Sequence, residues 1–501
     1  MSDRRFTVIR NGRVLGAGAA RAMPLDILIE DGRVREVGPA GMAAPPNAEP
    51  VDAADRLVIP GLVNSHTHAH GGLAKGAVAD RQPLEVFLTG SGALNGSRTL
   101  EDKHLSAKLS AVDMVRKGCT AAYDLFVEYP VPSIEGVEAV ARAYRDVGMR
   151  AVIAPMMADQ TLYQAYPGLV EALPEALRAT AQRAATAPYA ESLKACRTIL
   201  QSWSFDRDFL RPALGPTIPL HCSDDFLTGC RDLSREFEVG LQTHLAESAA
   251  QAAVALRRYG RSLTAHLDAL GLLNERFSAA HAIWLDHDDM ARIAGKGGAV
   301  AHNPLSNLRL GSGLAAVRAM LDRGLAVGIG TDAVATSDTQ NMFEAARLAA
   351  YLSRLRGPEY SQWLSAEEAF RLATEGSARV LGFGSKLGRI APGAFADLVF
   401  LDLAHINYVP LRDALLQLVN GESGAAIDAV MVGGRFVLRE GRLLTVDEAR
   451  LRREAEAARE RLDQANEAAV ASARLLEGWV GAFCIAHARS VDLPQRRLGS
   501  S

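Results

Sequence analysis

The strongest constraint on the fold is a regular alternation in the middle of the chain, over residues 58–384. Short apolar runs alternate there with longer helical stretches, which is the pattern of repeated strand–helix units and a parallel sheet. Eight runs can be counted: residues 58–66, 119–125, 150–157, 211–220, 240–246, 277–285, 298–304 and 326–334. Eight such strands predict a (β/α)8 barrel, with an open doubly wound sheet as the alternative.

Two β-rich segments flank this predicted barrel. Residues 1–57 and 385–444 contain short alternating runs separated by Asn-Gly, Asp-Gly and Gly-Gly turn signals. Neither segment has enough strands for an independent sheet, so we expect the two to combine into one small β-sandwich. Residues 445–501 form a predicted helical tail.

An apolar stripe follows one face of that tail. Its members are spaced alternately by four and three residues: Leu451, Ala455, Ala458, Leu462, Ala465, Ala469, Ser472 and Leu476. Such a stripe covers either the barrel of the same chain or another subunit. Because small residues along residues 448–476 allow a close approach, we predict a homodimer.

Composition narrows the class of protein. The 501 residues are 48% hydrophobic and 23% charged, with a formal net charge of −3, as in a soluble globular protein. Because the charge balance shows no basic excess, a nucleic-acid surface is not expected. No run of about 18 apolar residues predicts a membrane-spanning helix, and the first residues lack the apolar stretch of a signal peptide. Five scattered cysteines without a CxxC pair indicate reduced thiols and a cytoplasmic enzyme.

Polar residues end at least five of the eight runs, and active sites of barrels are built at that end of the strands. His66 and His68 lie two positions apart on one expected strand, so both imidazoles point to the same face. His244 ends the core of the fifth run, and Asp332 lies near the end of the eighth. Three imidazoles and one carboxylate suit a divalent ion, zinc first. We therefore predict a metal site at these four residues.

Glu247 follows His244 by three residues in the segment THLAES. As the chain leaves the strand, this carboxylate can return over the metal, take a proton from activated water and pass it to a leaving nitrogen. His281, in the sixth run, could bind metal, polarise the attacking water or orient the substrate, and spacing does not separate these roles. His302 and Asn303 end the seventh run, where His302 could contact substrate or bond neighbouring loops.

Five motifs occur in a fixed order: PGLVNSHTHAHGG, THLAES, AAHAIW, AHNPLSNLRLGSG and GIGTDA. Together they closely resemble the metal-dependent amidohydrolase superfamily, most of all its aminohydrolase branch, and the resemblance covers about residues 6–444. It implies a single zinc, or sometimes iron, held by His66, His68, His244 and Asp332. It also implies that Glu247 shuttles protons and that His281 assists the attacking hydroxide and the substrate, with Asp332 in the same catalytic group.

The chain departs from the family pattern near the expected substrate. Many relatives place a His or Arg after the Gly-Pro of the fourth strand, whereas this chain has Thr217 there and His221 four residues further on. Loop 70–104 lacks the Trp-rich pattern of deaminases of S-adenosyl compounds, which puts a standard nucleoside substrate in doubt. The fourth strand has no lysine to bridge two metals, which favours one ion per chain. The candidate substrate contacts are His70, His221, Trp284, His302 and Asn303.

These features predict a metal-dependent hydrolase of non-peptide C–N bonds that deaminates a nitrogen-containing heterocycle. Opening of a cyclic amide or amidine, or displacement of another leaving group as in triazine hydrolases, is the alternative reaction. A non-catalytic metal-binding scaffold is the alternative of another class. Glu247 argues against the scaffold, because a purely structural zinc closes its coordination sphere and needs no neighbouring acid. The expected partner is a small molecule, without a nucleic acid or a membrane.

Overall fold

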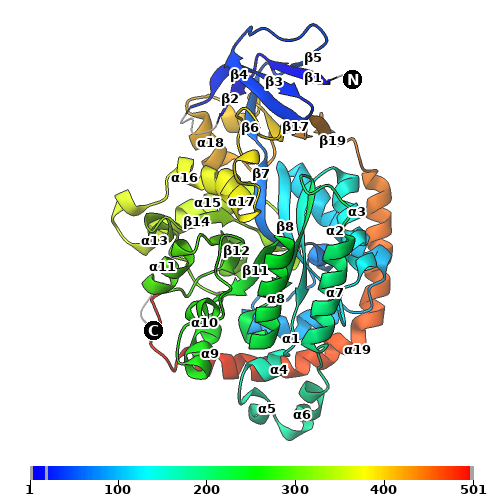
Figure 1. Ribbon diagram of the computed structural model, residues 1–501, viewed down its shortest axis with the longest axis vertical. Coiled ribbons are helices and arrows are strands. Elements are labelled where there is room, and N and C mark those ends of the chain that lie inside the picture. The colour runs from blue at the N-terminus through cyan, green and yellow to red at the C-terminus, as the bar shows by residue number, and fades with distance from the viewer. Residues whose placement is uncertain (1–3, 17–20, 497–501) are drawn as a thin grey trace.

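The computed structural model describes residues 4–16 and 21–496 and contains two sheets (Figure 1). The larger domain holds nine parallel strands in the order β14-β13-β12-β11-β10-β9-β8-β7-β15. Their bounds are β7 Leu62–His68, β8 Cys119–Val127, β9 Arg150–Met157, β10 Leu210–Pro216, β11 Gly240–Leu245, β12 Phe277–His281, β13 Ala299–His302, β14 Ala326–Ile329 and β15 Asp332–Ala333.

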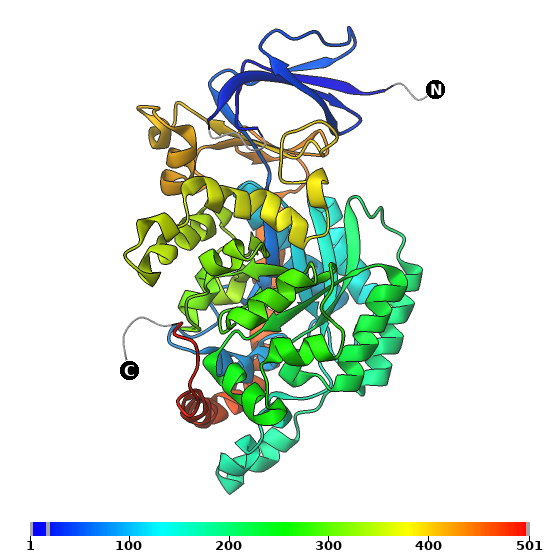
Figure 2. The ribbon, with the colours of Figure 1, turned by 60° about the vertical axis from the view of Figure 1, so that its left-hand side comes forward.

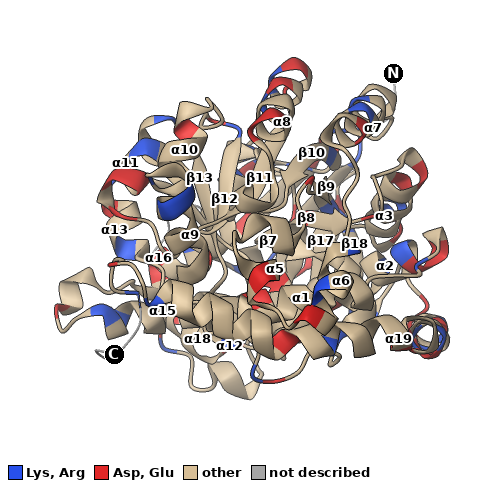
Figure 3. Ribbon diagram, turned by 90° about the horizontal axis from the view of Figure 1, so that it is seen from below, with Lys and Arg blue, Asp and Glu red and all other residues tan. Residues whose placement is uncertain are grey.

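The short strand β15 closes this sheet. β14 pairs with β13, the chain leaves the sheet for Gly330 and Thr331, and Asp332 then pairs with Thr67 of β7. β14 and β15 are thus two parts of the eighth strand, and the predicted (β/α)8 barrel is confirmed. Viewed from below (Figure 3), the strands lie in the centre, the helices surround them, and the charged residues gather on the helices.

The helices of the barrel region begin at polar caps in several places, which explains their boundaries. Ser133, Ser223 and Ser248 each accept a backbone N–H from the first turn of the helix that follows. The bounds of the longer helices are α1 Leu84–Leu94, α2 Leu100–Arg116, α3 Ile134–Val147, α6 Glu175–Gln182, α7 Tyr189–Ser202, α8 Asp224–Phe237, α9 Ala249–Tyr259, α10 Leu263–Ala269, α11 His287–Gly295, α15 Met342–Ser353, α18 Ala414–Gly421 and α19 Glu448–Ala488. The shorter ones are α4 Leu162–Ala165, α5 Leu169–Ala172, α12 Pro304–Arg309, α13 Val317–Asp322, α14 Val334–Ser337, α16 Ala366–Arg371 and α17 Ser377–Val380.

The second sheet unites the two ends of the β-rich sequence, as predicted, and lies beyond the start of β7 (Figure 2). The N-terminal strand β6 pairs antiparallel with the C-terminal strand β16. Ile27, Val58 and Met431 belong to one buried apolar cluster of this domain. Its strands are β1 Phe6–Arg10, β2 Arg13–Val14, β3 Met23–Glu30, β4 Arg33–Pro39, β5 Glu49–Asp52, β6 Arg56–Pro60, β16 Leu398–Asp402, β17 Ile427–Val432, β18 Arg435–Arg439 and β19 Arg442–Leu443.

One expected strand, residues 58–66, is two strands in the structure. β6 belongs to the terminal sheet and β7 to the barrel, and Gly61 stands between them. The Gly61 N–H donates to Asp397 O, and a Cβ at this position would lie 2.1 Å from Thr120 Oγ1. Only glycine fits this close approach, so an apparently continuous apolar run changes sheets at this residue.

The C-terminal helix α19 packs along the outside of its own barrel, against α1, α2 and α9. The predicted stripe is only partly correct: Ala465 and Ala469 are exposed, whereas Asn466 and Ala473 are buried. A strict four–three repeat drifts by about 20° per seven residues around a straight helix, so one face cannot keep every member. Residues 497–501 of the predicted tail lie outside the described residues.

Helix α19 also concerns the prediction that the chain has no membrane-spanning helix. One 18-residue window within it has a mean hydropathy of 1.4 and is long and apolar enough to cross a membrane, and 22% of that window is buried. Length and composition alone are weak evidence for a membrane span, and this helix contacts the barrel along much of its length. The absence of a membrane-spanning helix therefore stays a prediction.

Candidate metal centre and active site

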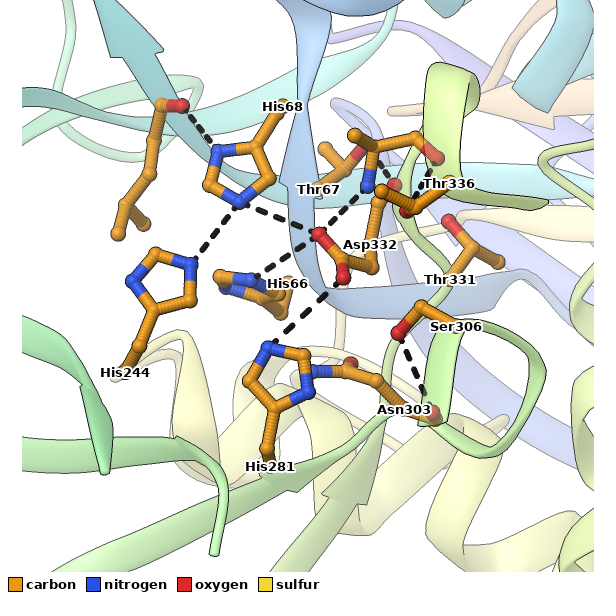
Figure 4. A network of polar contacts seen from close by, with 12 residues as sticks. His66, Thr67, His68, His244, His281, Asn303, Ser306, Thr331, Asp332 and Thr336 are labelled. Carbon is orange, nitrogen blue, oxygen red and sulfur yellow. Dashed lines mark hydrogen bonds and ion pairs between the residues drawn. The ribbon is translucent and has the colours of Figure 1, made fainter. Parts of the chain in front are cut away.

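Four histidines converge on one carboxylate at the carboxyl end of the barrel strands (Figure 4). Asp332 Oδ1 lies 3.2 Å from His68 Nε2 and 3.6 Å from His66 Nε2, and Asp332 Oδ2 lies 3.8 Å from His281 Nε2. His244 Nε2 lies 3.1 Å from His68 Nε2. The structure thus brings together the predicted metal ligands and His281.

Each of these imidazoles is held from behind through its Nδ1 atom. His66 Nδ1 donates to Gln242 Oε1 at 2.7 Å, and His281 Nδ1 donates to Asn307 Oδ1 at 2.8 Å. His68 and His244 use backbone carbonyls instead, Leu125 O and Thr217 O, both at 2.6 Å. Because a carbonyl oxygen only accepts, Nδ1 carries a proton in each ring, and Nε2 is the atom that each ring turns toward the centre, as second-shell bonds arrange in metal sites.

The donors fit a divalent metal ion. Nε2 atoms of His66 and His281 are buried without a hydrogen-bond partner among the described residues. Ligand atoms of His66, His68 and Asp332 lie within 4.8 Å of one another, as do those of His66, His244 and His281. Inward-facing imidazole nitrogens beside a carboxylate are the donor set that zinc and related divalent ions prefer.

The backbone at two of these positions is in the left-handed region, with φ of 67° at His281 and 63° at Asp332. A side chain other than glycine rarely adopts this conformation, and it recurs where a functional group must be aimed off the end of a strand. Asp332 Oδ1 also accepts the N–H of Ala333 at 2.6 Å. Both residues therefore turn out of their strands toward the shared centre.

Burial and mutual charge shift the pKa values in this cluster. Burial would raise the pKa of Asp332, but His66 and His68 hold it well below its usual value. Burial lowers the pKa of His66, and it lowers the pKa of His281 to about 4. Burial and the neighbouring imidazoles lower the pKa of His244 as well. These three imidazoles are thus neutral near pH 7, which is the form that binds a metal.

Glu247 lies beside this cluster, with Oε2 3.6 Å from His281 Nε2 and 2% of the residue exposed. Burial, followed by the charges of Asp332 and Glu85, raises its pKa well above the usual value. Its backbone N–H donates to Gln251 Oε1 at 2.9 Å, which fixes the turn after β11. A carboxyl group with a raised pKa at this position can both accept and return a proton near neutral pH.

A cavity opens in front of the cluster. Its lining includes His68, His244, Glu247 and Asp332 together with side chains of α1 and of the loops after β8 and β10. His70 is the one predicted substrate contact that lines it, and His70 Nδ1 accepts the N–H of Val127.

The other four predicted contacts lie outside the lining of this cavity. His221 is buried with its ring against Tyr166. Trp284 Nε1 donates to Ser312 O at 2.9 Å. His302 and Asn303 are buried at the end of β13. His302 lines a second cavity together with residues of α12, α13 and α15.

Sequence reasoning missed the residues that hold the site from behind, namely Gln242, Asn307 and Gln340. Gln242 lies two positions before His244 on β11, so the period of a strand could have indicated that it shares the inner face. Asn307 lies within the motif AHNPLSNLRLGSG. Gln340 follows Asp332 by eight residues in an irregular segment before α15, and no sequence pattern marks it.

Comparison with known proteins agrees with this geometry. The model of the Amidohydrolase family matches residues 57–437. The chain belongs to this family. It is 31% identical to a 5-methylthioadenosine/S-adenosylhomocysteine deaminase of Syntrophobacter fumaroxidans, over 89% of this chain and 96% of that protein. It is also 31% identical to a 5'-deoxyadenosine deaminase of Methanothermobacter thermautotrophicus, over 91% and 98% of the two chains.

Solved structures of other proteins share the fold. An adenosine deaminase from Xanthomonas campestris with bound zinc superposes with a TM-score of 0.81 at 27% identity, over 91% of this chain and 98% of that one. An atrazine chlorohydrolase from Arthrobacter aurescens gives 0.79 at 23% identity, over 90% and 100%, a likeness that concerns the fold alone. As a member of the amidohydrolase family, this protein is a metal-dependent enzyme acting on C–N bonds other than peptide bonds.

Proposed function

We propose that this protein is a zinc-dependent deaminase that removes an amino group from a nitrogen-containing heterocycle. One observation supports this proposal above the others: a cluster of His and Asp side chains lies beside a buried acid. His66 and His68 point Nε2 at Asp332, and Glu247 lies on the side of this cluster that lines the cavity. Deaminase names among the relatives support the same reaction class.

His66, His68, His244 and Asp332 would hold the ion. A divalent metal bound there would lower the pKa of its water to about 7 and so supply a nucleophile at neutral pH. Asp332 stays ionised because His66 and His68 lower its pKa. The zinc assignment rests on this nitrogen-rich donor set, and the fourth strand carries no lysine for a second ion.

The proton transfers belong to Glu247. Water adds to the ring carbon that bears the amino group, and the Glu247 carboxylate takes the proton that the water loses. Glu247 delivers this proton to the adjacent ring nitrogen, which becomes N–H as its C=N double bond opens. When the C=O bond then forms, the second proton of the water passes by way of Glu247 to the amino group, and ammonia leaves. The neutral His281, 3.6 Å from Glu247 and held by Asn307, directs its Nε2 toward the same point and orients the attacking oxygen and the ring.

An ammonia-release screen tests this proposal. Zinc-loaded protein is incubated with amino-substituted purines, pyrimidines, pterins and triazines, and metal-stripped protein is the control. We expect ammonia from at least one ring class and none after metal removal. An amine, a halide or an opened ring as the product, without ammonia, would instead support the alternative hydrolase reaction. A fully metal-loaded protein without turnover on any ring would contradict the proposed deaminase.

We also propose a cytoplasmic homodimer. The five cysteines are buried free thiols, which suits a reducing compartment. On α19, Leu475, Trp479 and Ile485 are 63%, 49% and 49% exposed, and large apolar side chains of this kind favour a subunit contact. A monomer mass at micromolar concentration in light scattering would contradict the dimer.

A further inference from the structure

The cavity in front of Glu247 is small and its walls are apolar. Leu84, Phe87 and Leu88 of α1 form one side, and Ile218 and Leu310 contribute to the rest. The cavity measures about 70 Å³. Such a space admits several water molecules, since one needs roughly 10–15 Å³. It therefore suits a compact ring better than a ring that carries a sugar.

The charges around this cavity are confined to its catalytic end. Acidic and imidazole side chains that line it are His68, His70, His244, Glu247 and Asp332, and the described residues of the lining include no Lys or Arg. An anionic group on a substrate would therefore enter without a cationic partner. Burying such a charge unpaired is strongly unfavourable.

Polar groups outside the catalytic end are few and uncharged. Thr336 Oγ1 already donates to Ala333 O, and Ser91 Oγ to Leu88 O. Asn95 Nδ2 donates to Ser91 O, which leaves its Oδ1 buried without a partner among the described residues. Thr217 and Tyr129 add one hydroxyl each. A polyol such as ribose presents several hydroxyl groups that must all be paired, and the few polar groups of this lining, Asn95 Oδ1 among them, are too few to pair them all.

We infer that this site selects a compact, uncharged amino-heterocycle with hydrogen or small alkyl substituents, and that it discriminates against the glycosylated and phosphorylated forms of the same ring. The inference rests on the proposed deaminase function and adds its substrate class. It separates this chain from those relatives whose names refer to adenosine derivatives, although the barrel and the family are shared.

A matched substrate series tests the inference. Each ring is offered to the zinc-loaded full chain as the free base, the N-ethyl base, the nucleoside and the nucleoside monophosphate; adenine and cytosine are two such rings. Ammonia release gives kcat/KM, and isothermal titration calorimetry gives Kd. We expect the free or ethyl base to exceed its nucleoside by roughly 10²-fold in kcat/KM, and the monophosphate to be weaker still.

The two readouts separate this inference from the proposed function. If the bases bind but no ammonia is released, the proposed deaminase function is contradicted, and the inference about the substrate that fits the cavity is supported. A nucleoside or monophosphate that binds or reacts better than its matched ethyl base would overturn the inference, whichever ring is used. Failure of every free and ethyl base to bind at 1 mM would overturn it as well.

A variant pair adds a structural test. Phe87→Ala removes one ring from the cavity wall, and Leu416→Ala is the control on the half-exposed face of α18. We expect Phe87→Ala to raise kcat/KM for an N-benzyl base about tenfold relative to the N-ethyl base. The control should leave this ratio unchanged. An unchanged ratio in Phe87→Ala would show that α1 does not limit the size of the substrate.

Discussion

At the scale of residues, the geometry of the site depends on the hydrogen-bond acceptor behind each histidine ring. His66, His68, His244 and His281 have their Nδ1 atoms bonded to oxygen acceptors from four different segments. This arrangement fixes both the tautomer and the direction of each ring before a ligand arrives. Glu247 differs, because its carboxylate faces the cavity and its raised pKa keeps proton transfer available.

Glu247→Gln tests whether Glu247 carries protons or binds the metal. The amide keeps the shape of the side chain but cannot accept a proton from water. We expect zinc content and substrate affinity to stay unchanged while kcat falls by roughly 10²–10⁴-fold, the usual contribution of general acid–base catalysis. Zinc is measured by mass spectrometry and kcat by ammonia release, with the exposed Glu467→Gln as control. Loss of zinc would make Glu247 a ligand, and normal turnover would remove it from the mechanism.

At the scale of elements, the central event is the closure of the barrel between β7 and β15. Gln340 is fully buried at this seam. Its Oε1 accepts from Thr67 Oγ1 and Thr331 Oγ1, both at 2.8 Å, and its Nε2 donates to Asp332 O at 3.0 Å. One side chain therefore ties the strand of His66 and His68 to the segment of Asp332.

Gln340→Met should loosen this seam, because the Thr67 and Thr331 hydroxyls lose an acceptor and the Asp332 carbonyl keeps only one of its two donors, while the volume of the side chain is retained. We expect zinc affinity to fall by about 10–100-fold, as for other groups that orient metal ligands. Competition with a chelator measures this change, and circular dichroism checks that the fold is retained. The same substitution at the exposed Gln362 is the control. Unchanged zinc affinity in a folded variant would restrict Gln340 to a structural role.

The barrel and the terminal sheet could be predicted from the sequence, as could the convergence of His66, His68, His244 and Asp332, because each depends on local patterns. Strand runs alternate with helices, and the ligands stand at their ends. The switch between sheets at Gly61 escaped prediction, since it depends on a contact with Thr120 that is distant in sequence. The buried face of α19 was misplaced for a similar reason: the barrel wall, including the Gly96 carbonyl that accepts from Asn466, decides which residues face inward.

At the scale of the whole molecule, buried histidines make stability depend on pH. Burial lowers the pKa of His221 to about 4, against about 6.5 in an unfolded chain. The unfolded state therefore binds more protons between these values, and stability is complete above pH 6.5 and lost as the pH falls toward 4. The shift corresponds to up to about 3 kcal/mol from this residue, at 1.36 kcal/mol per unit.

His221→Leu should reduce that acid sensitivity. The difference in free energy of unfolding between pH 7.5 and pH 5, measured by urea denaturation, should shrink by about 2 kcal/mol relative to the wild type. The exposed His287→Leu should leave it unchanged. If His221→Leu loses as much stability as the wild type between pH 7.5 and pH 5, then His221 is not a neutral buried group.

One divalent ion, held by His66, His68, His244 and Asp332, is proposed to make this barrel an enzyme. Metal-stripped protein titrated with zinc tests it most directly, with bound zinc and ammonia release followed together in the wild type and in Asp332→Ala. We predict that wild-type activity rises to a plateau at one zinc per chain, and that Asp332→Ala binds zinc weakly and stays inactive. Full activity without metal, a plateau at two ions per chain, or an Asp332→Ala variant that keeps both zinc and turnover would contradict the account.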